Sequence, residues 1–302
     1  MQNTRAYPTF GPAGSGSAFA AAGGKHTKDL PAWLKRYGLD AFEYQGGNGI
    51  RGSDAAFSEI GAAAREAGIL VSLHAPYFIS LSGVEEEKRL KSIEYIRASV
   101  RAAELLGADR IVIHTGSASK ITREEAMKLA ADTLTRTLDE LGEEGVKLGL
   151  ETMGKVNQLG TPEEVLSLCR LSPRLVPVYD FGHINARACG GAFPDADAFR
   201  RTFDRIAAVL GDDAAKNLHC HFSRIEWTGS GEKRHLNFED APAFGPDFEP
   251  FIEAVVRENL APRVICESAG KMAEDALTMK RHYLKLQGKQ EESVCLQKDW
   301  KN

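Results

Sequence analysis

The 302-residue chain lacks several features that would place it in well-known functional classes. It has no apolar run of 18 or more residues and no charged N-terminal region followed by an apolar stretch, so we expect neither a membrane span nor an export signal. It also lacks a G-x-x-x-x-G-K-[ST] phosphate loop and a G-x-S-x-G elbow, which leaves P-loop nucleotide hydrolysis and serine-hydrolase chemistry without support. These absences favour a cytoplasmic protein whose chemistry rests on other side chains.

Cysteines are few, and there is no excess of basic over acidic residues. The five cysteines stand at no spacing typical of a zinc finger, so we expect them to be reduced and mostly buried. With 38 basic and 42 acidic residues, the chain lacks the overall positive charge of many nucleic-acid-binding proteins. This argues only weakly against DNA, because a local basic rim and bound divalent cations can reverse the potential around an acidic site. We expect no membrane partner, and nothing indicates an obligate protein partner.

Short β-rich segments alternate with longer helical patterns, which is typical of repeated βα units and a parallel sheet. Eight is the number of strands in a (βα)8 barrel. We therefore predict an α/β fold, a single-domain TIM barrel over residues 1–287, with residues 288–302 as a C-terminal tail. The eight predicted strands are 7–10, 41–44, 70–74, 110–114, 147–151, 175–180, 217–222 and 263–267.

Periodicity and capping residues predict the helices between these strands. Apolar residues at three- and four-residue steps form one stripe over 88–106. Thr161, Pro162 and Glu164 read as a capping box with proline at the first helical position. Further helices are predicted over 124–144, 247–258 and 273–286, and the Gly-, Ala- and Ser-rich segment 11–24 is predicted to be the first βα loop.

Histidines and acids stand at, or just beyond, the ends of most predicted strands. One such acid is commonly a helix cap or an ion-pair partner, but here the pattern recurs. The carboxyl ends of barrel strands share one face, so these side chains should converge. Carboxylates mixed with imidazoles suit Zn²⁺ or Mn²⁺. The sequence therefore predicts a multi-metal active site that draws on His74, His114, Glu151, Asp180, His183, a histidine of the seventh strand, His235 and Glu267.

Five of these strand ends resemble the motifs of the endonuclease IV family of apurinic/apyrimidinic endonucleases. The resemblance implies a (βα)8 barrel with three zinc ions. It also implies membership of a wider group that includes xylose-isomerase-like sugar isomerases and epimerases. The segments that carry it run in order through most of the chain: Leu73-His74-Ala75-Pro76-Tyr77, Ile113-His114-Thr115-Gly116-Ser117, Leu150-Glu151-Thr152, Tyr179-Asp180-Phe181-Gly182-His183 and Ile265-Cys266-Glu267-Ser268.

The resemblance implies roles for individual residues. His74 and His114 would bind the first zinc ion. Glu151 would bridge the first and second ions and hold the attacking hydroxide, which makes it the expected catalytic residue. Asp180, Glu267 and a histidine of the seventh strand would complete the second site.

Two histidines of the seventh strand compete for that position. His219 and His221 are two residues apart, so they point to the same face of a strand. The family pattern overlays best with His219 as the ligand and His221 as a contact to another ligand or to the substrate. A shift of two residues would exchange these roles.

The third zinc site is expected from His183 and His235. Where the family has Asp-Arg-His, this chain has Glu232-Lys233-Arg234-His235, one residue longer. Glu232 would replace the aspartate with its longer side chain. If it does not, the third site is lost or weakened, and two ions remain.

Candidate contacts to DNA come from the loops. Tyr77 matches a position from which the family inserts side chains into DNA, while the preceding βα loop, residues 45–52, is glycine-rich and unlike the family's. Arg51 in that loop and Arg234 could still reach phosphate groups.

The leading hypothesis is a zinc-dependent phosphodiesterase that cuts DNA 5′ to abasic sites. The alternative is a sugar or sugar-phosphate isomerase or epimerase with a single Mn²⁺, Mg²⁺ or Co²⁺ ion, for which Glu151, Asp180, His219 and Glu267 would suffice. A non-catalytic metal-binding protein is a third possibility. The extra histidines His74, His114, His183 and His235 favour the phosphodiesterase.

Overall fold

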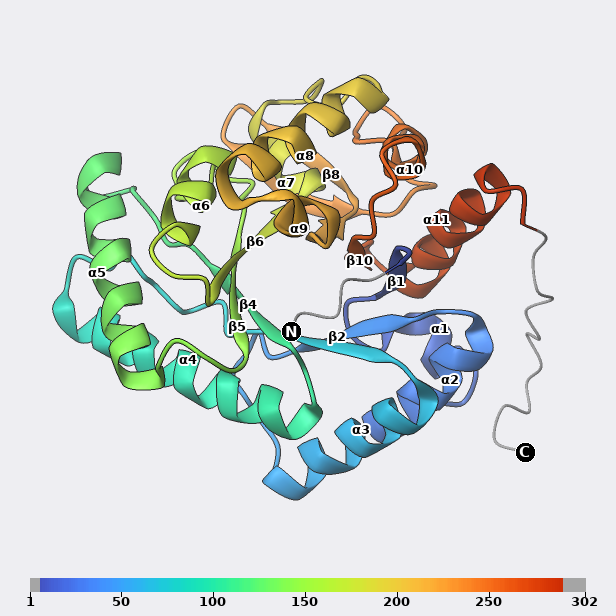
Figure 1. The fold of residues 1–302 in the computed structure, drawn as a ribbon, viewed down its shortest axis with the longest axis horizontal. Helices are drawn as coiled ribbons and strands as arrows, with labels where there is room; N and C mark the ends of the chain where they lie inside the picture. The colour runs from blue at the N-terminus through green and yellow to red at the C-terminus, as the bar shows by residue number, and fades with distance from the viewer. Residues whose placement is uncertain (1–5, 290–302) are drawn as a thin grey trace.

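Eight parallel strands form a barrel with helices on its outside in the computed structural model, which describes residues 6–289 (Figure 1). The strands follow the order β1-β10-β7-β6-β5-β4-β3-β2, so each strand from β2 to β6 lies beside the next one along the chain. The predicted single-domain TIM barrel is thereby confirmed. Its strands are β1 (Thr9–Pro12), β2 (Ala41–Gln45), β3 (Leu70–His74), β4 (Arg110–His114), β5 (Lys147–Glu151), β6 (Leu175–Asp180), β7 (His219–Phe222) and β10 (Arg263–Cys266).

The helices cover the barrel with their apolar faces. In α4 the predicted stripe is buried through Ile93, Ile96, Val100 and Leu106. The capping box at Thr161 is present. Among the described helices, none is both long and apolar enough to cross a membrane. They are α1 (Gly16–Ala21), α2 (Leu30–Tyr37), α3 (Asp54–Ala67), α4 (Glu86–Leu106), α5 (Arg123–Leu141), α6 (Pro162–Cys169), α7 (Phe181–Arg187), α8 (Ala196–Leu210), α9 (Asp212–Lys216), α10 (Phe248–Arg257) and α11 (Met272–Leu286), with a 3-10 turn at Thr27–Asp29.

The prediction of a loop over 11–24 is wrong in part. Strand β1 continues to Pro12, and α1 occupies Gly16–Ala21. Burial overrides composition here, because Phe19 of α1 packs edge-on against Trp33 of α2 with ring centroids 5.4 Å apart. At the other end of the chain, α11 ends at Leu286, and residues 290–302 of the predicted tail lie outside the described part.

The barrel closes at a seam between β1 and β2, where Gly11 is essential. Few backbone bonds cross the seam: the amide of Asp40 donates to the carbonyl of Phe10, and that of Gly14 donates to the carbonyl of Glu43, each at 2.9 Å. A Cβ at Gly11 would lie 1.8 Å from the carbonyl oxygen of Ala41. The two strands can approach this closely only because Gly11 has no side chain.

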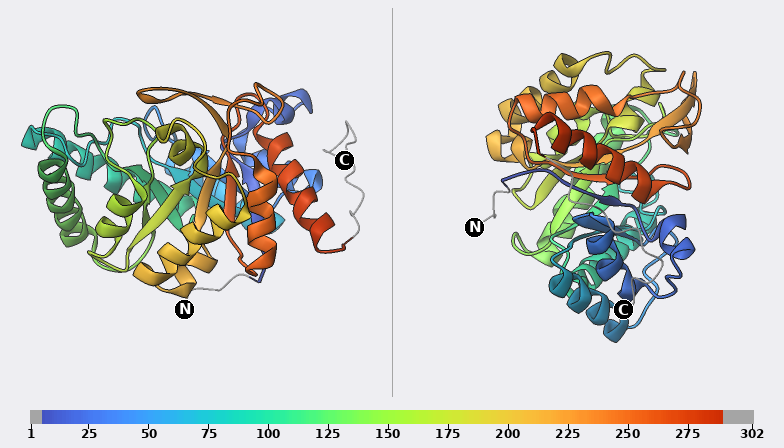
Figure 2. Two further views of the ribbon diagram at one scale, coloured as in Figure 1. Left: turned by 90° about the horizontal axis from the view of Figure 1, so that it is seen from above. Right: turned by 90° about the vertical axis from the view of Figure 1, so that its right-hand side faces the viewer.

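Strand β7 is followed by an antiparallel hairpin that interrupts the βα alternation. The hairpin comprises β8 (Arg224–Thr228) and β9 (Gly231–Leu236). The left-hand view of Figure 2 shows the orange segment that contains β9 crossing one end of the barrel. This hairpin was not predicted from the sequence, and it carries two of the candidate ligands.

The seam gives a stability prediction. We expect Gly11→Ala to destabilise the fold by about 3 kcal/mol, because the backbone of Ala41 cannot move aside as a flexible side chain can. Gly229→Ala is the matched control, since a Cβ there meets nothing within 4 Å. Its effect should stay within about 0.5 kcal/mol. Urea unfolding of the two variants measures both values, and equal effects would contradict a tight seam.

Candidate metal centre

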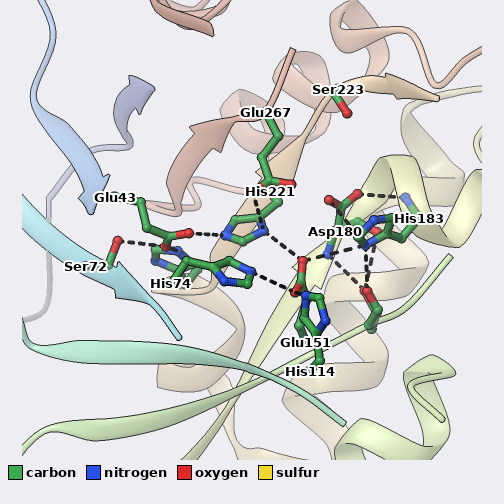
Figure 3. Close-up of polar contacts among 12 residues, drawn as sticks. Glu43, Ser72, His74, His114, Glu151, Asp180, His183, His221, Ser223 and Glu267 are labelled. Atoms are coloured by element: carbon green, nitrogen blue, oxygen red, sulfur yellow. Dashed lines mark hydrogen bonds and ion pairs between the residues drawn. The ribbon is translucent and has the colours of Figure 1, made fainter. Parts of the chain in front are cut away.

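Histidines and carboxylates at or next to the ends of β3, β4, β5, β6, β7 and β10 meet His183 of α7 at the carboxyl end of the barrel (Figure 3). The β8–β9 hairpin adds Glu232 and His235. Five groups of side chains in the described residues could hold a metal ion, and within each group one ligand atom per residue lies within 4.8 Å of the others. Two of them contain Glu43, with His219 and His221 in one and with His74 and Glu267 in the other. The remaining three lie side by side and contain the residues predicted from the sequence. These three groups are His74, His114 and Glu151; Glu151, Asp180, His221 and Glu267; and His183, Glu232 and His235.

Glu151, at the end of β5, belongs to two of these groups and is fully buried. Its Oε2 lies 3.4 Å from Nε2 of His74 and 3.3 Å from Nε2 of His114. Its Oε1 lies 2.9 Å from Nδ1 of His221. The two oxygens thus face different groups, which is the arrangement expected of a bridging carboxylate.

The second group is rich in carboxylates. Asp180 ends β6 and caps α7, because its Oδ1 accepts a hydrogen bond from the amide of His183 at 2.7 Å. Glu267 follows β10, and its Oε1 lies 3.6 Å from Nδ1 of His221. Three acids therefore surround one imidazole.

The structure places His221 among the acids of the second group, where His219 was the preferred candidate. Nδ1 of His221 faces Glu151 and Glu267, whereas Nε2 of His219 lies 3.0 Å from Glu43 and away from Asp180. Both rings are fully buried on the same face of β7, as their spacing required. Strand β7 reaches only to Phe222, so the residue nearer its carboxyl end is the one that reaches the site.

A β-bulge in the hairpin brings Glu232 and His235 together. Trp227 pairs with Glu232 and Glu226 pairs with Arg234, so Lys233 is the extra residue of β9. Lys233 and Arg234 both form ion pairs with Glu226, on the opposite face of the hairpin. In a regular strand, residues three apart point to opposite faces, but the bulge restores the shared face.

The third group accommodates the longer side chain of Glu232. Its Oε2 lies 3.5 Å from Nε2 of His183, and its Oε1 lies 3.9 Å from Nε2 of His235. A Cβ at Gly154 would lie 2.6 Å from Cβ of Glu232, so the missing side chain there gives the glutamate its space.

Three of the candidate histidines have their second nitrogen bound to oxygen. Nδ1 of His74 lies 2.8 Å from the carbonyl oxygen of Ala75. Nδ1 of His183 lies 3.0 Å from the carbonyl oxygen of Thr152. A carbonyl only accepts, so Nδ1 donates in both rings, and each presents Nε2 to its group. Nδ1 of His235 lies 2.9 Å from the hydroxyl of Ser223 and also leaves Nε2 facing the group.

The acids are arranged as a cation site requires. Oε2 of Glu151 and Oδ2 of Asp180 are buried and have no hydrogen-bond partner within residues 6–289. Burial and the charges of Glu151 and Asp180 raise the pKa of Glu267 to about 7, although His221 opposes this shift. Carboxylates so crowded and so poorly hydrogen-bonded need positive charge nearby, which protonated histidines or divalent cations can supply.

The same crowding acts on the histidines. Burial by itself lowers the pKa of His74, but its contact with Glu151 and the neighbouring acids raise it to about 9. Burial also lowers the pKa of His183. The charges of Asp180, Glu232 and Glu151 outweigh this effect and raise the pKa to about 9. Protons therefore occupy these rings at neutral pH when no other cation is present.

The three residues predicted to contact DNA differ in their contacts with the site. Tyr77 is 55% exposed, and its ring centroid lies 5.5 Å from that of His74 and 5.6 Å from that of His114. A Cβ at Gly47 would lie 2.3 Å from this ring, so the glycine-rich loop is shaped around it. Arg51 and Arg234 are exposed, and the latter pairs with Glu226 at 2.6 Å.

Sequence reasoning missed Glu43, which is fully buried on β2. Its Oε2 accepts a hydrogen bond from the hydroxyl of Ser72 at 2.9 Å. His219 contacts the same oxygen at 3.0 Å, and burial lowers the pKa of His219 to about 3. The signal was an acid within a short β-rich segment, Ala41-Phe42-Glu43-Tyr44, which on its own reads as a solvent-facing position.

Comparison of the sequence with known proteins finds a matching family model and several relatives. The family model described as "Xylose isomerase-like TIM barrel" matches residues 31–283. An uncharacterized protein, MJ0133 of Methanocaldococcus jannaschii, is 32% identical over 214 residues, 70% of this chain and 76% of that protein. A probable endonuclease 4 of Acholeplasma laidlawii is 30% identical over 172 residues, 55% of this chain and 57% of that protein. The second match thus spans little more than half of the relative's length.

Solved structures agree on the fold. Endonuclease IV from Thermus thermophilus has a TM-score of 0.65 at 18% identity, covering 87% of this chain and 94% of that one. A D-tagatose 3-epimerase-like protein has a TM-score of 0.64 at 20% identity, covering 82% of this chain and 89% of that one. Identities this low support the shared barrel and do not distinguish the two activities.

The raised histidine pKa values predict a pH-dependent affinity for Zn²⁺. A metal ion must displace the protons of His74 and His183, so the affinity should rise as the pH increases from about 6 to about 9. Competition with a chelator of known pH dependence measures it. An affinity that stays constant over this range would mean that neither histidine is a ligand.

The bulge predicts a tolerated deletion. Removing Lys233 should leave Glu232 and His235 two residues apart on one face of a regular strand, so the number of zinc ions per chain should not change. Glu232→Ala should cost one ion, because it removes an oxygen ligand. Elemental analysis of both variants gives the counts, and loss of an ion on deletion of Lys233 would contradict the bulge argument.

Proposed function

Since the chain belongs to the xylose isomerase-like TIM barrel family, we propose that it is a zinc-dependent phosphodiesterase of the endonuclease IV type, cutting DNA 5′ to abasic sites. The observation that carries this proposal is the presence of three adjacent ligand groups joined through Glu151 and Asp180–His183. A barrel that needs one metal ion requires only the second group. The histidines of the first and third groups support a larger cluster.

We assign the ions to these groups. His74 and His114 would hold the first with Glu151, and His221, Asp180 and Glu267 would hold the second with the same carboxylate. The ligand set of nitrogen and oxygen atoms suits Zn²⁺, while Mn²⁺ is the next candidate.

The third ion would be held by His183, Glu232 and His235. Three divalent ions, with a total charge of +6, would more than offset the four negative charges of Glu151, Asp180, Glu232 and Glu267.

The chain's own residues would orient the reaction. Such ions lower the pKa of water from ~15.7 to ~7 and stabilise the leaving oxygen of an in-line displacement. Glu151, fully buried and in contact with the imidazoles of His74, His114 and His221, would orient the attacking oxygen. Tyr77 covers the rings of His74 and His114 and restricts access of bulk water to them.

The proposed substrate contacts begin at Tyr77. Its ring is half exposed beside the site, where it could stack in the space left by a missing base. Arg51 and Arg234 would contact phosphates, the latter in exchange for its present pairing with Glu226. Recognition would then depend on backbone shape and on the deformability of DNA without a base, not on base identity.

His114→Ala is the decisive variant. It should lower cleavage of abasic DNA by at least about 100-fold and reduce the number of zinc ions per chain by one, because it removes a ligand of the first group. The assay uses a duplex with one synthetic abasic site, and elemental analysis gives the metal count. His26→Ala, at an exposed histidine, is the matched control and should leave both values unchanged.

Two outcomes would contradict the proposal. Full cleavage activity in His114→Ala would show that this histidine serves neither metal nor reaction. A wild-type chain that holds one metal ion, leaves abasic DNA intact and interconverts sugars or sugar phosphates would instead support the isomerase or epimerase, with His221 in place of His219 among its four ligands.

A further inference from the structure

Glu43 makes a buried polar network beneath the ligand groups (Figure 3). Its Oε2 is occupied by Ser72 and His219, at 2.9 and 3.0 Å. Its Oε1 lies 3.1 Å from Nε2 of His221, but the two atoms lack the alignment of a hydrogen bond, and neither has another hydrogen-bond partner among the described residues. Oε1 of Glu43 therefore has Nε2 of His221 as its available partner.

The orientation of His221 differs from that of the other candidate ligands. His74, His183 and His235 present Nε2 to their groups, and their Nδ1 atoms lie against nearby oxygens. His221 presents Nδ1 to Glu151 and Glu267, so the nitrogen that needs a partner is Nε2. Glu43 reaches this Nε2 from β2, across the barrel interior.

Burying the carboxylate of Glu43 costs desolvation free energy, and the need to fill space does not explain why a carboxylate is present. Glu43 is fully buried, and an apolar side chain of the same size would fill the space without desolvating a charge. Ser72 and His219 are also fully buried and each binds its Oε2, so together they fix the direction of Oε1. The network therefore orients the carboxylate toward His221.

We propose that Glu43 is a positioning residue that accepts the Nε2 proton of His221 and thereby holds this ring with Nδ1 toward the second metal position. His219 then has a role that its place in the sequence did not indicate: it orients Glu43 and is not a metal ligand. The inference rests on the proposed metal centre, and it assigns to the chain a carboxylate–histidine pair of the kind that tunes metal affinity.

Two substitutions separate hydrogen-bond acceptance from volume and charge. Glu43→Met keeps the volume and removes the acceptor, so it should weaken binding of one zinc ion by about 10- to 100-fold. Glu43→Gln keeps an acceptor oxygen without the charge and should retain most of the affinity. Asp109→Asn is the control for zinc affinity. It removes the charge of a carboxylate that pairs with Arg263 at the opposite end of the barrel. Chelator competition on the full chain gives the affinities.

A measurement on the wild-type chain avoids any failure of a variant to fold. Long-range ¹H–¹⁵N spectra of the zinc-loaded protein with labelled histidine should show His221 with metal at Nδ1 and a proton at Nε2. A metal-bound Nε2 on His221 would overturn the proposal. So would an unchanged affinity in Glu43→Met, or equal losses in Glu43→Met and Glu43→Gln.

The outcomes also separate this proposal from the one it rests on. A wild-type chain that takes up no Zn²⁺ would contradict the metal centre and the role of Glu43 together. Zinc uptake with the wrong ring nitrogen, or without dependence on the acceptor at position 43, would contradict only the role of Glu43.

Discussion

The concentration of negative charge at one end of the barrel is the constraint on which the rest of the site depends. Glu43, Glu151 and Asp180 are fully buried, and Glu267 lies beside them. Carboxylates removed from water in such proximity cannot all remain charged unless cations or donors compensate them. The histidines around them contribute to this compensation, and the ions that we propose for the site would complete it. The barrel supplies the geometry, because parallel strands deliver their last residues to one face.

The sequence could predict this face because His74, His114, Glu151 and Asp180 each stand at the end of a short β-rich segment. The limits of β3, β4, β5 and β6 were predicted correctly, and these strands carry His74, His114, Glu151 and Asp180. The end of such a strand is easily recognised, because the apolar run stops at a polar residue. The third group was also predicted, including Glu232, although the means by which it joins His183 was not.

What could not be predicted depends on contacts between distant segments. Spacing showed that His219 and His221 share a face, but only the height of β7 in the barrel decides which ring reaches the acids. Glu43 lies inside its strand and finds its partners on β3 and β7, so no local pattern marks it. Gly11 seemed part of a loop because its need for close approach arises from β2, about thirty residues away along the chain.

Because of the bulge in β9, the third group keeps its acid and its histidine together although the segment between them has an extra residue. An additional residue is absorbed on the outer face, where Lys233 and Arg234 share Glu226, and the inner face keeps its acid and its histidine. A single residue can therefore be gained or lost at this point of the hairpin while Glu232 and His235 keep their shared face. Motif searches that demand a fixed spacing between them will pass over relatives that have retained the site.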